Sequence, residues 1–240
     1  MTRKTLAGGL LLSLLAVSAA LTMRHSPATD AARAGTAVDA SNFVSHISNP
    51  WLPYRPGSRW VYRGIKDGQD QIDVVKATHR TKLIEGVTCT AVSDIATHNG
   101  TVLERTTDWY AQDTAGNVWY FGERTAAYEN GHIDRSGSWQ AGVHGARPGI
   151  FMNAHPAVGD THRQEYLRGE AEDQYWLVDL HQHASVPYGT FHHAALTLEW
   201  SRLEPNVIDR KLYVHGIGDI SEVSAQGPRE TAFLISFRHP

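Results

Sequence analysis

The chain has 240 residues, of which 41% are hydrophobic and 20% are charged. This length and apolar content suit one domain that buries about 70% of the surface of its unfolded chain, and they exclude a wholly disordered protein. The 22 Lys and Arg against 25 Asp and Glu give a net charge of −3, which argues against a nucleic-acid-binding protein and against a polybasic membrane face. The one cysteine, Cys89, excludes an internal disulfide and every metal site built from several cysteines.

The N-terminal residues predict a secretory leader of bacterial type. Arg3 and Lys4 form a short positive region, residues 6–15 are mostly apolar, and residues 17–20 offer small side chains to a signal peptidase. The apolar run is too short to cross about 30 Å of hydrocarbon, so we expect no integral membrane span. We therefore expect a signal peptide over residues 1–20, a flexible tether over 21–42 and a single β-rich domain over 43–240, secreted or held in the cell envelope.

From residue 59 onward the pattern is that of successive β-strands. β-Branched and aromatic residues run over 59–63, 71–77, 87–92, 101–110 and 118–121, and turn residues separate these runs. Residues 129–160 contain six glycines and predict a long Gly-rich loop that crosses the sheet. Strands are expected again over 175–180, 194–200, 211–214, 217–223 and 231–237. The expected fold is therefore mainly β, a single antiparallel sheet curled into a barrel or half-barrel, with few helices.

One hairpin has a register that the sequence predicts. In the segment Val186-Pro187-Tyr188-Gly189, Pro stands at the second position and Gly at the fourth, as a type I turn prefers. If Val186 pairs with Gly189, directly opposed residues share a face, and the more apolar face is expected to look inward. The residues on that face, which we predict to bind an apolar ligand, are Tyr175, Leu177, Leu196, Leu198 and Trp200.

The same register places three histidines at the turn end of that face. His181, His183 and His192 could converge on one Zn²⁺ or Cu²⁺, because imidazole nitrogens from one face can reach a common metal ion. The alternative is a polar, solvated hairpin end, since a slip of one residue sends the histidines to opposite faces. No other cofactor is expected.

A second polar group is acidic. Glu165, Glu170 and Glu172 lie close together in the sequence, and two carboxylates across a cleft are what general acid–base hydrolysis requires. The alternative, which we favour, is a solvated hairpin whose glutamates pair with Arg163 and Arg168 at the surface. A non-catalytic role is therefore favoured over an enzyme.

Several segments carry resemblances to known groups of proteins. Residues 108–123 (DWYAQDTAGNVWYFGE), with 137–142 (GSWQAG) and 148–152 (PGIFM), resemble a group of uncharacterised secreted bacterial proteins with no established activity. Residues 186–191 (VPYGTF) and 211–222 (KLYVHGIGDISE) are similar to the last strands of periplasmic proteins with a LolA-like half-barrel. The second resemblance implies a curved antiparallel sheet around an apolar cavity, with a lipid-like ligand. Neither resemblance assigns a role to a residue.

The function predicted from the sequence is that of a secreted, non-catalytic binding protein for an apolar or amphipathic small molecule or lipid. The first alternative is a metal-dependent or carboxylate hydrolase of the cell envelope, which would use the histidines or the glutamates above. The second is a structural or adhesion protein with exposed strands. An interior lined by Leu, Val and Trp would favour the binding protein, and convergence of the histidines would favour the enzyme.

Overall fold

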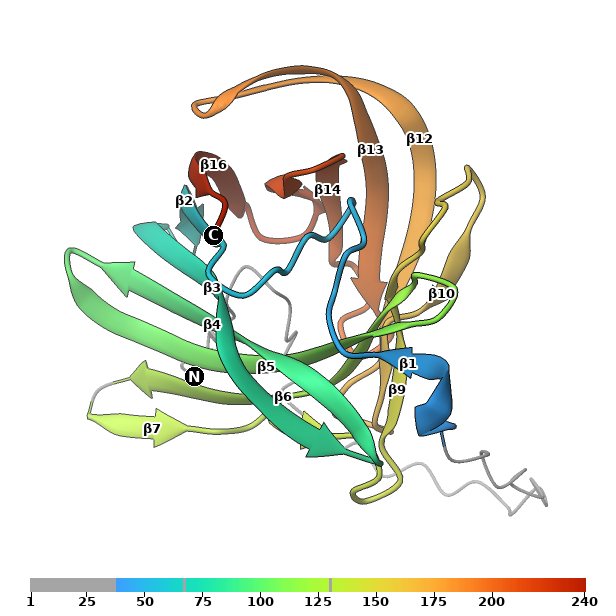
Figure 1. Cartoon of the computed structure of the whole chain (residues 1–240). Coiled ribbons are helices and arrows are strands. Elements are labelled where there is room, and N and C mark those ends of the chain that lie inside the picture. Colours follow the sequence, from blue (N-terminus) through green and yellow to red (C-terminus); the bar gives the residue numbers. More distant parts are fainter. Residues whose placement is uncertain (1–37, 67, 130) are drawn as a thin grey trace, which may run out of the picture.

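The computed structural model describes residues 38–66, 68–129 and 131–240, so the predicted signal peptide and most of the predicted tether lie outside the described residues. The described chain confirms the predicted fold class, because it forms one antiparallel sheet curled into a nearly closed barrel (Figure 1). Its single helical element is a 3₁₀ turn, Ala40–Asn42, within those ranges. No described helix has the length and apolar character needed to cross a membrane.

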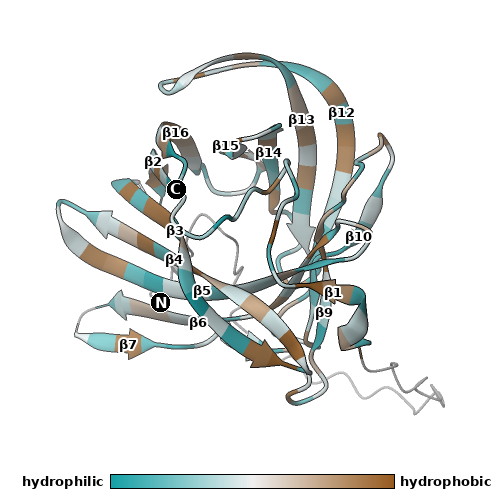
Figure 2. Cartoon of the chain, viewed as in Figure 1, coloured by the Kyte–Doolittle hydropathy of each residue, from teal (hydrophilic) through white to brown (hydrophobic). Residues whose placement is uncertain are grey.

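Sixteen strands make up the sheet, and a path through thirteen of them follows the order β10-β12-β13-β14-β15-β16-β2-β3-β4-β5-β6-β9-β11. Polar and apolar residues alternate along most of these strands, as expected when the two faces of a sheet differ in environment (Figure 2). The strands are β1 (Phe43–Val44), β2 (Arg59–Lys66), β3 (Gln69–Ile84), β4 (Val87–His98), β5 (Thr101–Asp113), β6 (Val118–Glu129), β7 (His132–Asp134), β8 (Trp139–Gln140), β9 (Arg147–Met152), β10 (Thr161–Arg163), β11 (Glu165–Tyr166), β12 (Asp173–Val186), β13 (Gly189–Ser201), β14 (Ile208–Val214), β15 (Gly218–Gln226) and β16 (Thr231–Arg238).

Tight turns connect the first half of the barrel. The turn between β3 and β4 contains Glu85 and Gly86 with φ of 47° and 80°, and the turn between β4 and β5 contains Asn99 and Gly100 with φ of 49° and 79°. Two-residue hairpin turns favour this left-handed conformation because its twist matches that of the flanking strands. Every strand expected from the sequence is present, and most are longer than expected because polar residues continue them.

The barrel closes at two places. Strand β16 pairs with β2, which joins the last strand of the sheet to the first long one. At the seam, β10 pairs with β12 while β11 pairs with β9, and only Gln164 separates β10 from β11. The Gln164 N–H donates to the Asp173 carbonyl at 2.9 Å. The chain itself therefore bridges the two ends of the sheet.

The Gly-rich segment differs from the expected crossing loop. Strands β7, β8 and β9 all pair with β6, so the segment extends the sheet instead of crossing it. A glycine permits this close packing: a Cβ on Gly122, which has φ of 134°, would lie 2.4 Å from the Trp139 carbonyl oxygen. Short runs between glycines are long enough for edge pairing, which the composition alone does not indicate.

A segment between β1 and β2 crosses the barrel (Figure 1). Ile47, Leu52 and Tyr54 in this segment are buried, and the Tyr54 ring lies 5.4 Å from that of Trp60. The Trp60 indole donates to the Ile217 carbonyl at 2.7 Å. Aromatic and aliphatic side chains therefore fill the part of the barrel beside this segment.

Candidate binding site in the barrel interior

The interior of the barrel is strongly acidic. Of the 23 Asp and Glu residues in the described part of the chain, ten are buried, whereas one of the 18 Lys and Arg residues, Lys211, is buried. Carboxylates are almost never fully buried unless they are paired, so this excess is the most unusual chemical feature of the molecule. The ten buried acidic residues are Asp73, Asp94, Glu104, Asp108, Glu123, Glu165, Asp173, Glu199, Asp209 and Asp219.

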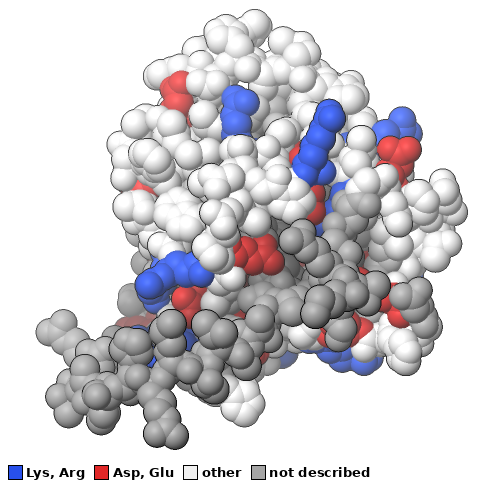
Figure 3. All heavy atoms as spheres, turned by 180° about the vertical axis from the view of Figure 1, so that it is seen from behind, with Lys and Arg blue, Asp and Glu red and all other residues white. Residues whose placement is uncertain are grey.

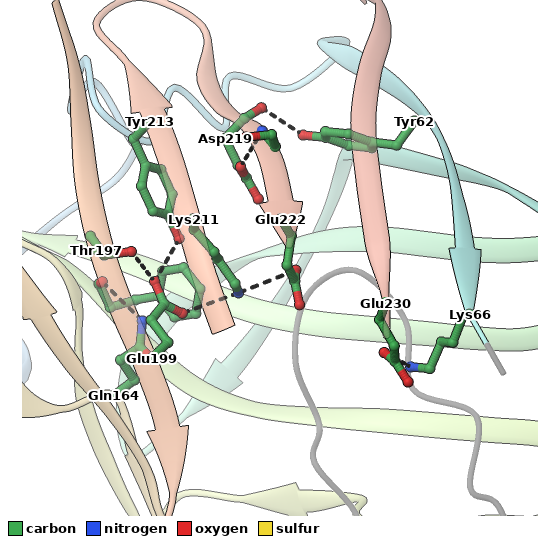
Figure 4. Close-up of polar contacts among 12 residues, drawn as sticks. Tyr62, Lys66, Gln164, Thr197, Glu199, Lys211, Tyr213, Asp219, Glu222 and Glu230 are labelled. Atoms are coloured by element: carbon green, nitrogen blue, oxygen red, sulfur yellow. Dashed lines mark hydrogen bonds and ion pairs between the residues drawn. The ribbon is translucent and has the colours of Figure 1, made fainter. Parts of the chain in front are cut away.

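Lys211 on β14 is the centre of the best-connected group (Figure 4). Its Nζ lies 3.1 Å from Glu199 Oε2 and 3.6 Å from Glu222 Oε2, on the two neighbouring strands. Thr197 and Tyr213 donate hydrogen bonds to Glu199 Oε1 at 2.9 and 3.1 Å.

Electrostatic interactions in this group favour the charged lysine. Burial lowers the pKa of Lys211, but the carboxylates of Glu199 and Glu222 outweigh burial and hold that pKa above its usual value. Burial raises the pKa of Glu222 well above its usual range, although Lys211 opposes this shift. Burial also raises the pKa of Asp219 to about 7, again against the effect of Lys211. The single Lys211 ammonium group therefore stabilises the charged form of several carboxyl groups.

A second acidic group lines β4 and β5, beside a cluster of tyrosines. Tyr120 donates to Asp108 Oδ1 at 2.8 Å, and burial raises the pKa of Asp108 to about 8 despite this hydrogen bond. Burial and the adjacent Asp73 carboxyl raise the pKa of Asp94 well above its usual range. The Tyr110 ring stacks on that of Tyr120 at 4.8 Å. Buried carboxyl groups here therefore adjoin aromatic ring faces.

A third acidic pair lies at the seam of the barrel. Burial and the neighbouring Asp173 raise the pKa of Glu165 well above its usual range. Burial raises the pKa of Asp173 to about 7, while Ser201 and Lys211 act to lower it. These two residues link the Lys211 group to the tyrosine side of the interior.

The buried polar atoms of this interior that have no hydrogen-bond partner among the described residues include Asp108 Oδ2, the Tyr110 hydroxyl and the Tyr175 hydroxyl. All three side chains are fully buried. Buried polar groups in folded proteins are nearly always satisfied, so each of these atoms is a place where a bound group or water would gain a hydrogen bond. They identify the interior as the candidate binding site.

The predicted ligand-binding residues do not share one face. Val186 pairs with Gly189 as predicted, but bulges between Leu177 and Ala184 shift the register, so that Leu177 pairs with Thr197. As a result, Tyr175 and Leu177 are fully buried in the barrel, whereas Leu196, Leu198 and Trp200 are only half-buried on its outer side. The prediction that all five look inward is wrong, because the inward positions of β13 are occupied by polar residues: Thr197, Glu199 and Ser201.

Two of the displaced residues line a separate pocket. Leu198 and Trp200, with Trp176 and residues 204–208, surround a largely apolar pocket of about 320 Å³ on the outside of the barrel. Trp176 is 43% exposed. A volume of this size is at the lower end of the range for small-molecule sites.

The predicted metal ligands form two separate pairs. His183 Nδ1 lies 3.1 Å from His192 Nδ1, as the register predicts, but the His181 ring adjoins that of His193 instead, at 5.9 Å. The bulges around Gln182 cause this separation. Across the described ranges, no group of three or more His, Cys, Asp or Glu side chains is arranged to hold a metal ion.

The predicted glutamates are also separated. Glu165 is buried in the interior, Glu170 is exposed, and Glu172 lies outside the interior, where its Oε1 accepts a hydrogen bond from the Gly169 N–H at 3.0 Å. The rest of the acidic interior was not predicted from the sequence, because apolar residues were expected on the inner face. The alternation Glu104-x-Thr106-x-Asp108-x-Tyr110 along a single strand was the available signal.

The chain is similar in structure to two solved proteins of low sequence identity. No protein-family model matches the chain, and no curated protein is similar to it. Two solved structures cover 79% of this chain and 99% of their own. One, from Bacteroides fragilis, is described as an exported protein with a YmcC-like fold (12% identity, TM-score 0.47), and the other, from Parabacteroides distasonis, is described as a lipoprotein (11% identity, TM-score 0.46).

Proposed function

We propose that the protein is an exported, non-catalytic binding protein whose barrel takes up a small amphipathic molecule bearing a positively charged group. The observation that carries this proposal is the buried and unpartnered set of Asp108 Oδ2 and the Tyr110 and Tyr175 hydroxyls, within an interior that holds ten acidic residues and one lysine. An ammonium group would supply the missing positive charge and hydrogen-bond donors together.

The size of the barrel supports an internal ligand. Barrels of about eight strands have interiors that side chains just fill, or that hold one small ligand, and the diameter grows with the number of strands. The strand path here contains thirteen strands, although those at the seam are short. A sheet of this size can enclose a wider interior than an eight-stranded barrel does.

The aromatic residues beside the acidic groups fit the same ligand. The Tyr54 and Tyr110 ring centroids lie 5.1 Å apart, and Trp139 packs edge-on against Tyr120 at 5.3 Å. Tyr and Trp ring faces attract alkylammonium groups, and the attraction grows where water is excluded. Carboxyl groups and ring faces in one interior thus favour an amine over a carboxylic acid. The predicted lipid ligand of a LolA-like half-barrel would need an apolar interior instead.

Binding of a cation should release protons. Asp108, Asp173 and Asp219 have raised pKa values between about 7 and 8, so part of each population is protonated at pH 7. Among the charges that face them, Lys211 favours ionisation of Asp173 and Asp219, whereas Asp73, Glu104, Glu199 and Glu204 oppose ionisation of one or more of the three. A bound ammonium group would favour ionisation further, so its affinity should rise with pH between about 6 and 8.

The test compares three ligands of equal chain length: dodecylamine, dodecanol and dodecanoate. Calorimetry should detect saturable binding of the amine only, with proton release revealed by buffers of different ionisation enthalpy. Asp108→Asn should weaken amine binding by about tenfold, whereas Glu170→Gln, at an exposed position, should leave it unchanged. Equal binding of the three ligands, or an Asp108→Asn variant with unchanged affinity, would overturn the assignment of a cationic ligand.

The outer pocket supports a second candidate ligand, one that is wholly apolar. If dodecanol binds and a Leu198→Arg substitution abolishes that binding, the pocket formed with Trp176 and Trp200 is the binding site. This result would restore the apolar ligand predicted from the sequence and would place it outside the barrel.

A further inference from the structure

Burial of the acidic residues changes the charge of the surface. With ten acidic residues and one basic residue buried, 17 basic and 13 acidic residues remain on the less buried part of the described chain. The surface of the described chain is thus net basic, although the whole chain carries −3. On the back of the molecule, charged side chains of both signs are scattered among uncharged ones (Figure 3).

Basic residues form a row across the outer face of six neighbouring strands. Arg238 on β16 pairs with Arg59 on β2, and Arg59 pairs with Lys76 on β3. The row continues through Ser93 and Thr107 to Arg124 on β6. Directly opposed residues lie on the same face, and like charges in such positions destabilise a sheet unless something compensates them.

The row ends in a groove of about 400 Å³ over β4, β5 and β6. Arg105, Arg124 and Arg135 line the groove together with hydroxyl groups that include Thr107. Thr107 on β5 pairs with Arg124 on β6, and Arg105 lies two residues before Thr107. Arg105 and Arg124 are therefore diagonal neighbours, whose Cα atoms are typically about 7–8 Å apart.

The arginines of this groove lack acidic partners. No ion pair within the described ranges involves Arg105, Arg124 or Arg135, and all three are exposed. Three acidic residues directly precede these arginines: Glu104 and Glu123 are buried, and Asp134 accepts hydrogen bonds from the backbone and the side chain of Ser136. Arginine forks match the geometry of phosphate oxygens, and several forks around one group strengthen its binding.

From this arrangement we propose that the groove formed by Arg105, Arg124 and Arg135 binds a phosphoryl group. The row through Lys76 and Arg59 extends the positive potential beyond the groove and draws anions toward it. The group could belong to a soluble phosphate compound or to the headgroup of a phospholipid. This site lies on the outer face of the sheet and is independent of the proposed ligand in the interior.

Two probes distinguish a soluble phosphate compound from a phospholipid headgroup. Calorimetry with inorganic pyrophosphate tests for a soluble ligand, and sedimentation with phosphatidylcholine vesicles, with and without phosphatidylglycerol, tests for a lipid headgroup. In either case, an Arg105→Gln/Arg124→Gln variant should lose affinity by about tenfold or more. Arg229→Gln, an exposed substitution between β15 and β16, is the matched control and should bind as the wild type does.

The salt dependence provides a measurement that needs no variant. Binding to exposed arginines should weaken as ionic strength rises, because salt screens exposed charges. Absence of wild-type binding to both probes at low salt would overturn the proposal. An equal loss of affinity in the control and the double variant would also overturn it.

Discussion

Replacement of Lys211 by methionine should destabilise the protein strongly at neutral and alkaline pH. The substitution nearly preserves the length of the side chain but removes the charge that lies 3.1 Å from Glu199 and 3.6 Å from Glu222. Removal of one partner from a buried ion pair costs about 3–5 kcal/mol, because the remaining charge stays buried. At about 2–4 °C per kcal/mol for a chain of this size, the melting temperature should fall by about 6–20 °C.

The loss should depend on pH. Lys211 lowers the pKa of Glu222, so without the lysine this pKa rises further above its value in the unfolded chain. A group with a raised pKa in the folded state stabilises the fold below its unfolded pKa and loses that contribution as pH rises through the folded pKa. The deficit of Lys211→Met relative to the wild type should therefore be smaller at pH 5 than at pH 8.

Urea unfolding at the two pH values measures this difference. A Lys211→Met/Glu199→Gln double variant should recover part of the lost stability, since it removes a carboxylate that the lysine had neutralised. Lys76→Met, at an exposed position without an ion pair, is the control and should change stability by less than about 0.5 kcal/mol. A Lys211→Met variant that is no less stable than Lys76→Met at pH 8, or whose stability deficit grows toward acid pH, would contradict this role of Lys211.

Three further predictions follow from individual residues. Because the pKa of Asp108 is raised to about 8, the ligand-free protein should lose stability as pH rises from 5 to 8.5, and Asp108→Asn should flatten this dependence; an unchanged pH profile in the variant would count against the raised pKa. Burial raises the pKa of the Cys89 thiol to about 12, so iodoacetamide should leave the native protein unmodified and alkylate it in denaturant, and rapid native alkylation would contradict the buried placement. Gly122→Ala should lower the stability by about 2 kcal/mol or more, since its Cβ would lie 2.4 Å from the Trp139 carbonyl oxygen. Thermal unfolding measures this loss. Gly68→Ala, whose Cβ meets no atom within 4 Å, is the control that shows how much of the loss is due to backbone strain alone.

The sequence predicted the barrel because strand signals are local. Turn residues such as Asn99-Gly100 and runs of β-branched residues act over a few positions, so each strand was visible independently of the others. The Val186–Gly189 turn was predicted on the same basis.

The inner face was not predictable in the same way. Along β13, leucines alternate with Thr197 and Glu199, and the usual rule sends the leucines inward. The bulges in β12 and the ion pair between Glu199 and Lys211 on the next strand instead place the leucines outward. Both depend on neighbouring strands that a single sequence does not align. The Gly-rich segment was predicted wrongly for a similar reason, because its three short strands form by pairing with β6 and, for β9, also with β11.

The pairing of β16 with β2 has a consequence for the order of folding. Arg59 near the start of the described chain pairs with Arg238 near its end, so β2 has one of its two neighbours only when nearly the whole chain is available. Contacts between such distant residues make folding slow, since the loop must close before the pairing stabilises it. The secretory leader predicted from the sequence fits this delay, because an exported chain crosses a membrane before its barrel closes. The pairing of β16 with β2 that closes the barrel therefore also prevents closure before β16 has been synthesised.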